Sequence, residues 1–271
     1  MILISLAATA LMLSALMTAA WILQRKTRNS GWADVFWSYA TGLCGVFLAL
    51  VPWGGGHPAS AARQFLVAIL IAIWSIRLGT HILQRTLGSK VEDARYAALR
   101  GEWKDAFQSR LFWFLQIQAA AAFPLVVSVG IAAHNPARGI GPLDIFGAFV
   151  LIAAIFGAGV ADNQLKQFTS IRANKGKICD AGLWSWSRHP NYFFEWLGWL
   201  AYPLIAINPG GGYPWGFVAL SGPLFMFWLL RYVSGVPPLE THMIKKHGGN
   251  FLAYRERVSS FFPRPPKPPE N

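Results

Sequence analysis

The run from Pro142 to Ala161, PLDIFGAFVLIAAIFGAGVA, contains a single charged side chain, Asp144. An α-helix of roughly 20 apolar residues crosses a bilayer core about 30 Å thick, so this run predicts a transmembrane helix. A continuous helix is expected because a backbone in lipid must satisfy its own hydrogen bonds. Asp144 lies where the span begins, and we interpret it as a helix cap or a contact to lipid headgroups.

Six other stretches of the chain are apolar over similar lengths. The remaining predicted spans are residues 2–23, 35–53, 64–84, 112–134, 190–207 and 213–231. Hydrophobic residues make up 54% of the chain and charged residues 13%, against roughly 25% charged in soluble domains. This composition excludes a disordered chain, a coiled coil and an ordinary cytosolic globule. The predicted fold class is all-α, an integral membrane protein with seven transmembrane helices.

Lysine and arginine are concentrated in every second connection between these spans. The segments 24–33, 85–111, 162–189 and the tail from Arg231 hold three, six, five and seven of them, which is 21 of the 24 in the chain. Because positive residues stay on the cytoplasmic side, this alternation predicts an N-terminus outside and a C-terminus in the cytoplasm. The net charge of +12 then reflects topology, and we expect no nucleic-acid partner. A cleaved signal peptide over residues 1–20 is the alternative, but it lacks a positive region before its apolar run.

Two cysteines and the proline-rich end complete the outline of the chain. Cys44 and Cys179 are too few for a disulfide scaffold or a cysteine-based zinc site, so we expect buried thiols and no metal. Residues 1–262 are predicted to form a single membrane domain. Residues 263–271, beginning Pro-Arg-Pro-Pro-Lys-Pro-Pro, are predicted to be a disordered tail.

The predicted span 190–207 carries an ionisable group. Glu195 lies within an apolar helix, where a charge is expensive and therefore indicates a functional site by default. Asn191 is four residues earlier on the same helix face, and Trp199 extends that face by one turn. The alternative is a buried glutamate that a neighbouring arginine neutralises.

Basic and aromatic residues cluster around the cytoplasmic ends of the later spans. Pro190 suits the first position of a helix, so Arg188 and His189 lie at a helix N-terminus, which favours anions. Asp162 and Lys166 are one turn apart at the end of the preceding span, and Arg172 follows in the same loop. The third cluster consists of Arg231, Glu240, His242, Tyr254, Arg255 and Arg257. Such residues suit a ligand with phosphates and a flat ring, or alternatively anionic lipid headgroups.

Three polar residues of the N-terminal half, Asp34, His81 and Tyr96, are candidates for catalysis. Arg77, His81 and Arg85 recur every fourth residue and form one stripe near the inner face. Tyr96 could act as a general acid, since a phenol donates a proton while staying uncharged at neutral pH. Asp34, where the second span begins, is either a helix cap or a carboxylate that faces a cavity.

Residues from about 158 to 263 resemble the C-terminal domain of the membrane steroid 5α-reductase family, and in particular its bacterial branch. The matching pieces are Asp162 to Lys166, Gly182-Leu-Trp, Asn191-Tyr-Phe-Phe-Glu195, Leu230-Arg231, Tyr254 to Pro263 and, upstream, Asp34-Val-Phe-Trp37 and Glu92-Asp-Ala-Arg-Tyr96. The resemblance implies a seven-helix reductase that uses NADPH to reduce the double bond of an enone, typically a 3-oxo-Δ4 steroid. It also implies cofactor contacts for Asn191, Glu195, Asp162 and Arg231.

The expectation is therefore an enzyme of a bacterial inner membrane with its active site toward the cytoplasm. Residues 1–134 would form the substrate half, which takes a sterol-like lipid from the bilayer, and residues 142–262 the half that binds NADPH. The cofactor set is Asp162, Lys166, Arg172, Arg188, His189, Asn191, Tyr192, Glu195, Trp199, Arg231, Glu240, His242, Tyr254 and Arg255. The animal enzymes carry a Gln-Glu pair and a third-helix tyrosine that are missing here in register, so Asp34, His81 and Tyr96 are the substitutes for the catalytic role.

A second family shares part of this sequence. Isoprenylcysteine carboxyl methyltransferases and bacterial phospholipid methyltransferases, which bind S-adenosylmethionine, also carry the pattern of Arg188-His-Pro-Asn-Tyr192, followed by a glutamate like Glu240 and a tail like Tyr254-Arg-Glu-Arg257. Asn191 with Glu195 fits the reductase better, because they offer amide and carboxylate partners to a nicotinamide carboxamide. A lipid-binding or transport protein without enzymatic activity is the third reading.

Overall fold

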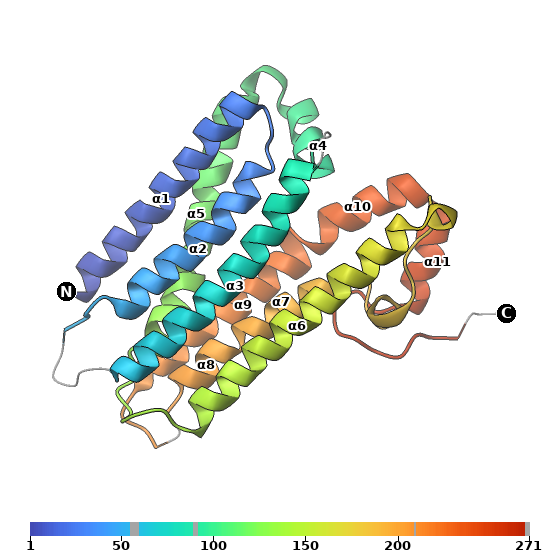
Figure 1. The fold of residues 1–271 in the computed structure, drawn as a ribbon. Coiled ribbons are helices and arrows are strands. Elements are labelled where there is room, and N and C mark those ends of the chain that lie inside the picture. The colour runs from blue at the N-terminus through green and yellow to red at the C-terminus, as the bar shows by residue number, and fades with distance from the viewer. Residues whose placement is uncertain (55–59, 89–91, 209, 269–271) are drawn as a thin grey trace. The chain divides into compact units, whose positions relative to one another are not determined.

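The computed structural model describes residues 1–54, 60–88, 92–208 and 210–268, and it consists of helices joined by turns (Figure 1). The α-helices are α1 (Ile2–Thr27), α2 (Trp32–Leu50), α3 (Ala61–Gly88), α4 (Ala94–Trp103), α5 (Phe107–Ala133), α6 (Pro142–Ser170), α7 (Pro190–Trp199), α8 (Ala201–Ala206), α9 (Ser221–Trp228), α10 (Val236–His247) and α11 (Gly249–Arg257). Short 3-10 helices occupy Lys104–Ala106, Arg172–Asn174, Gly182–Ser185 and Pro214–Leu220, and a π-helical turn occupies Leu229–Val233. The described residues contain no β-strand, which confirms the predicted all-α class.

Among the residues that the structure describes, six helical stretches are long and apolar enough to cross a membrane. They are Ile2–Thr27, Trp32–Leu50, Ala61–Gly88, Arg95–Ala133, Pro142–Ser170 and Pro214–His247. The protein is thus a multi-pass membrane protein, as the sequence predicts. The orientation, with the N-terminus outside, stays a prediction.

The predicted span 190–207 differs from the other six. It consists of α7 and α8, which a turn at Leu200 separates. Pro203 has no N–H, so the carbonyl of Trp199 lacks the donor that would continue the helix. The sequence contains this proline, and its effect is to divide the apolar stretch into two short helices.

The chain forms two compact units. Unit 1 consists of residues 1–148 and 200–225, and unit 2 consists of residues 149–199 and 226–271. The predicted substrate half, residues 1–134, lies within unit 1. Residues 200–225 of the predicted cofactor half also belong to unit 1, while the rest of that half from residue 149 onward belongs to unit 2.

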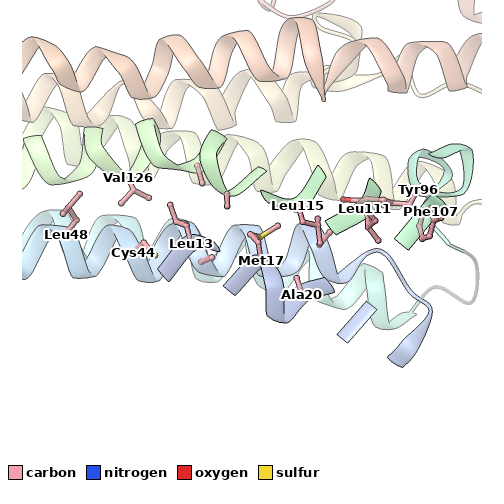
Figure 2. Close-up of a cluster of buried hydrophobic side chains, with 14 residues drawn as sticks. Leu13, Met17, Ala20, Cys44, Leu48, Tyr96, Phe107, Leu111, Leu115 and Val126 are labelled. Atoms are coloured by element: carbon pink, nitrogen blue, oxygen red, sulfur yellow. The ribbon is translucent and has the colours of Figure 1, made fainter. Parts of the chain in front are cut away.

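Unit 1 is built on the long helices α1, α2, α3 and α5. Helices α1, α2 and α5 pack against one another, and α3 packs against α2 and α5 (Figure 1). Their buried faces form an apolar core between α1, α2 and α5, shown in Figure 2, that includes Leu13, Met17, Cys44, Leu48 and Leu115. Cys44 is buried, as expected. Lipid tails are as apolar as these side chains, so the helices associate through close packing of their side chains.

Small residues let α2 and α3 approach closely. A Cβ atom added at Gly42 would lie 2.1 Å from the side chain of Ser75, so only glycine fits there. The Ser75 hydroxyl donates a buried hydrogen bond to the Ser38 carbonyl across the helices, at 3.0 Å. Close backbone approach with an interhelical hydrogen bond is how helices associate in lipid.

Asp144 forms a buried ion pair in unit 1. Its carboxylate accepts hydrogen bonds from the Arg63 guanidinium at 2.7 and 2.8 Å and from the backbone N–H of Gly141 at 2.7 Å. Arg63 also donates to the carbonyls of Asn135, Ala137 and Gly139. Asp144 therefore does stabilise the start of α6, as the cap interpretation proposed, but its main partner is an arginine from α3.

The proline-rich end is anchored over its described part. Residues 263–268 form no helix or strand, and the N–H groups of Arg264 and Lys267 donate to the carbonyls of Trp186 and Arg257 at 2.9 and 3.0 Å. The last part of the predicted disordered tail, residues 269–271, lies outside the described residues.

Candidate functional site

Unit 1 holds a cluster of polar side chains around Asp34, in the first turn of α2. The Tyr96 hydroxyl, from the first turn of α4, donates to Asp34 Oδ1 at 2.9 Å. The Arg95 guanidinium donates to Asp34 Oδ2 at 2.5 Å, and the Arg85 guanidinium lies 3.9 Å from the same oxygen. Tyr96 is 2% exposed, whereas the Asp34 side chain is 18% exposed. The cluster thus joins a buried phenol to a carboxylate whose charge arginine compensates.

Two further carboxylates hold α4 in place. Asp93 caps α4 by accepting from the Arg95 N–H at 3.0 Å, and it also accepts from the Arg95 guanidinium. Glu92 accepts from Arg100 at 2.9 Å and from the Ser30 hydroxyl at 2.6 Å. Burial would raise the pKa of both carboxyls, but the arginine and serine hydrogen bonds outweigh it and lower each pKa below its ordinary value. Both groups therefore stay ionised and keep the segment fixed to unit 1.

Asp34 lies in the first turn of α2, and its carboxylate contacts side chains of α3 and α4. The alternative, a carboxylate that faces a cavity, stays a prediction. Two of the three catalytic candidates, Asp34 and Tyr96, are in direct contact. The third, His81, lies on α3 with an exposed side chain.

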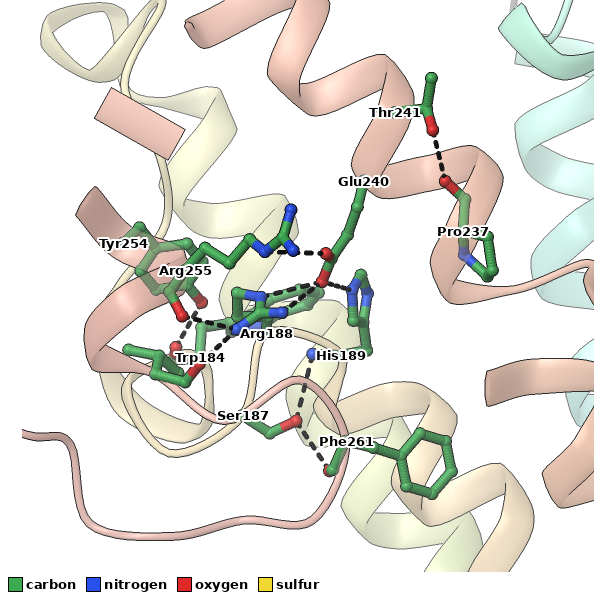
Figure 3. Close-up of polar contacts among 11 residues, drawn as sticks. Trp184, Ser187, Arg188, His189, Pro237, Glu240, Thr241, Tyr254, Arg255 and Phe261 are labelled. Atoms are coloured by element: carbon green, nitrogen blue, oxygen red, sulfur yellow. Dashed lines mark hydrogen bonds and ion pairs between the residues drawn. The ribbon is translucent and has the colours of Figure 1, made fainter. Parts of the chain in front are cut away.

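Unit 2 holds a second cluster, which joins residues far apart in the sequence (Figure 3). Arg188 donates to Glu240 Oε1 through Nε and Nη2, at 2.9 and 2.7 Å. Its third nitrogen donates to the carbonyls of Arg255 and Val258. Arg188 is 7% and Glu240 8% exposed. Removing one partner of such a buried ion pair strongly destabilises the folded protein, because the other charge stays buried without compensation.

His189 is part of the same cluster. Its Nε2 lies 3.1 Å from Glu240 Oε1, and its ring stacks on Tyr192 with the centroids 5.4 Å apart. The histidine is 3% exposed. Burial lowers its pKa below the ordinary value, and the hydrogen bond to Glu240 offsets that effect only in part. His189 is therefore neutral at physiological pH.

The end of the chain closes over this cluster. The Arg188 N–H donates to the Ser259 carbonyl at 2.8 Å, and the Ser187 hydroxyl donates to the Phe261 carbonyl at 2.9 Å. The Tyr254 hydroxyl donates to the Trp184 carbonyl at 2.5 Å, and burial raises its pKa. Arg255 reaches the second oxygen of Glu240 at 4.0 Å. All of these contacts join residues of unit 2 to one another, so they stabilise the fold of unit 2.

Asp162 of α6 and Asn191 of α7 form a separate polar group. The Asn191 side chain donates to Asp162 Oδ1 at 3.3 Å. Glu195 follows one turn later on α7 and is half-buried, while Trp199 at the end of α7 is 1% exposed. The resemblance assigned Asn191 and Asp162 to one cofactor, and the structure brings the two side chains together.

Three cations of the predicted cofactor set form no ion pair with a described residue: Lys166, Arg172 and Arg231. Arg231 lies in the π-helical turn and is half-buried, with its guanidinium 5.2 Å from the Tyr232 ring centroid. Lys166 and Arg172 are exposed, as is His242 on α10. These side chains, unlike Arg188, have charge to offer to a phosphate.

Several members of these clusters were not singled out from the sequence. Arg95 bonds both Asp34 and Asp93, and Glu92 bonds Arg100 in the same segment. The signal that could have found them is four charges of both signs within nine residues next to apolar spans.

The comparisons with known proteins place the chain in one family. Residues 20–258 match the family described as protein of unknown function DUF1295, so the chain belongs to that family. No curated protein and no solved structure matches the chain.

Proposed function

We propose that the protein is an NADPH-dependent membrane reductase that reduces the carbon–carbon double bond of an enone in a sterol-like lipid, typically a 3-oxo-Δ4 steroid. The observation that carries the proposal is the contact between Tyr96 and Asp34. Polarising an enone requires a proton donor that stays protonated, placed where water is excluded. A buried phenol beside a compensated carboxylate meets both requirements. The proposal also rests on the resemblance to steroid 5α-reductases.

The residues of unit 1 would act on the ketone. Tyr96 now donates its one O–H to Asp34, so it must release that hydrogen bond to donate to a substrate carbonyl. Arg95 continues to compensate the Asp34 carboxylate when this happens. Negative charge that develops on the carbonyl oxygen is then stabilised by the Tyr96 hydroxyl, and water or a side chain protonates the α-carbon.

The residues of unit 2 fit the demands of NADPH. Its phosphates need cations that internal carboxylates have not neutralised, and Arg231, Lys166 and Arg172 are such cations. Its carboxamide needs an amide and a carboxylate, which the Asn191 and Asp162 pair offers, with Glu195 one turn further along α7. When bound, NADPH supplies a hydride to the β-carbon of the enone.

Thermal unfolding of the purified protein in mild detergent tests the cofactor. A ligand at a hundredfold excess over its dissociation constant adds about 2.7 kcal/mol to the stability of the folded state. We expect NADPH to raise the unfolding temperature and S-adenosylmethionine to leave it unchanged. Stabilisation by S-adenosylmethionine alone would overturn the proposal.

Asn191→Ala sharpens the same test. The change removes an amide but no charge, so we expect NADPH affinity to fall by about tenfold, the effect of losing one hydrogen bond to the neutral carboxamide. Asn163→Ala, an exposed asparagine on α6, is the control. Equal NADPH affinity in the two variants would remove Asn191 from the cofactor site.

One observation favours the methyltransferase reading. Arg188, His189 and Glu240, which the methyltransferase families share, meet in one cluster. That reading predicts stabilisation by S-adenosylmethionine and no oxidation of NADPH. A lipid-binding protein would respond to neither, and Glu195→Gln would change its yield without affecting any turnover.

A further inference from the structure

His189 was expected to help bind an anion, but its surroundings oppose that role. Glu240 Oε1 lies 3.1 Å from His189 Nε2 and accepts from Arg188 as well, which marks it as an ionised carboxylate. A carboxylate can only accept, so Nε2 must carry the proton and donate. In the neutral ring the other nitrogen, Nδ1, then carries a lone pair and can only accept.

The Nδ1 atom has no partner within the described protein. It is buried from solvent, and no described donor lies within hydrogen-bond distance. The ring is fixed on both sides, by Glu240 at Nε2 and by the stack on Tyr192. A buried acceptor without a donor costs roughly 1–3 kcal/mol, so a group that fills this role in the working protein is expected.

The chemistry of that group is limited. A phosphate or carboxylate oxygen would oppose its own lone pairs to that of Nδ1, so an anion does not fit at this atom. The nearby positive charge of Arg188 is already neutralised by Glu240 and the backbone carbonyls. A neutral O–H donor fits.

We propose that His189 Nδ1 accepts a hydrogen bond from a ribose hydroxyl of the bound nucleotide cofactor, with Glu240 holding the ring in the required tautomer. The inference rests on the proposed function only in that the ligand carries a ribose. NADPH and S-adenosylmethionine both do. His189 is thus assigned to the sugar, while Arg231 and the exposed cations are left for the phosphates.

Two substitutions separate the two ring nitrogens. In His189→Gln the amide N–H reaches the place of Nε2 and keeps the bond to Glu240, but the acceptor at Nδ1 is lost. In His189→Asn the amide oxygen occupies the place of Nδ1, but the bond to Glu240 is lost. His247→Gln, at the end of α10, controls for the same chemical change elsewhere in unit 2.

The experiment titrates the full-length protein in detergent with NADPH and with S-adenosylmethionine, and records unfolding temperatures without ligand. We expect His189→Gln to unfold near the wild-type temperature yet bind the cofactor about fivefold to tenfold more weakly, the effect of one neutral hydrogen bond. His189→Asn should be less stable but keep more of the affinity. If the wild type binds a cofactor and His189→Gln binds it equally well, the inference fails while the proposed function stands.

The two ligands distinguish the ways in which the account can fail. If the protein binds S-adenosylmethionine and not NADPH, the reductase proposal fails, and the contrast between His189→Gln and His189→Asn still tests the ribose contact. If it binds neither nucleotide, both proposals are overturned. Equal loss of affinity in the two variants would also overturn the ribose contact, because the ring would then be needed only as a whole.

Discussion

Arginine meets carboxylate in both units, but the pairs differ in what else they contact. Arg188 in unit 2 directs its donors to Glu240 and to two backbone carbonyls, and the end of the chain covers it. Arg95 in unit 1 compensates Asp34, whose other oxygen is bound by a phenol. The Arg95 side chain is 35% exposed and that of Arg188 is 7% exposed. The comparison teaches that the pair in unit 2 is tied into the backbone of its own unit, whereas the pair in unit 1 binds the hydroxyl of a buried tyrosine, the group to which the proposed function gives the role of proton donor.

Removing the arginine of unit 2 should have the largest effect. Arg188→Ala removes the arginine that donates two hydrogen bonds to the buried Glu240 and leaves only the more distant Arg255 beside it, so we expect the free energy of unfolding to fall by about 3–5 kcal/mol. Thermal unfolding in detergent measures this. The control is Arg257→Ala, because Arg257 and Asp180 form an exposed pair at 3.7 Å whose loss should be nearly neutral. Similar unfolding temperatures for the two variants would show that the cluster around Arg188 is not structural.

Removing the phenol of unit 1 should act on turnover. Tyr96→Phe deletes the proposed donor to the substrate ketone, and a single such donor contributes about a hundredfold to the rate. The oxidation of NADPH in the presence of a 3-oxo-Δ4 steroid measures it. Tyr39→Phe is the matched control, since the Tyr39 hydroxyl hydrogen-bonds Thr80 at 3.0 Å within the same unit. If Tyr96→Phe turns over at the rate of Tyr39→Phe, the phenol has no chemical role.

A smaller effect is expected from pH, again through unit 2. The pKa of His189 is lowered by burial from an ordinary value of 6.5. Above pH 6.5 the ring is neutral in both the folded and the unfolded chain, so its protonation does not lower the free energy of unfolding. As the pH falls below it, the unfolded chain takes up a proton that the folded chain refuses, and the free energy of unfolding decreases until the folded pKa is passed.

The measurement is the unfolding temperature between about pH 7.5 and about pH 5.5, in the wild type and in His189→Gln. His134, whose pKa burial also lowers, acts in the same direction in both proteins. The informative quantity is therefore the difference between them. We expect a steeper decline for the wild type, and parallel curves would show that His189 is not held neutral.

Most of the fold was accessible from the sequence because lipid imposes a simple requirement. Six apolar stretches of the described residues form helical segments long enough to span a membrane, five of them around one long α-helix and the sixth, Pro214–His247, from several shorter helical pieces. The stretch 190–207 is different, because Pro203 lacks the backbone N–H that would continue the helix. The average hydrophobicity of a stretch does not reveal the loss of one backbone hydrogen bond. The division into two units was not accessible, since it depends on long-range packing of residues 200–225 with α5.

The candidate site was accessible only in part. Asp34 and Tyr96 were both singled out, yet 62 positions separate them and no local pattern links the two. The place of Arg188 before a helix predicts an anion site, and the sequence does not indicate that its guanidinium donates to Glu240 and to the carbonyls of Arg255 and Val258. Side-chain partners between distant segments are set by tertiary structure, which residue type and spacing do not determine.

The most direct test of the central claim is isotope transfer. The purified protein is incubated with a 3-oxo-Δ4 steroid and NADPH that carries deuterium at its transferable position, and the product is analysed by mass spectrometry and NMR. We predict a saturated ketone with deuterium on the carbon β to the carbonyl, and loss of this product in Tyr96→Phe. Unchanged steroid and NADPH, together with methyl transfer from S-adenosylmethionine to a lipid acceptor, would contradict the account.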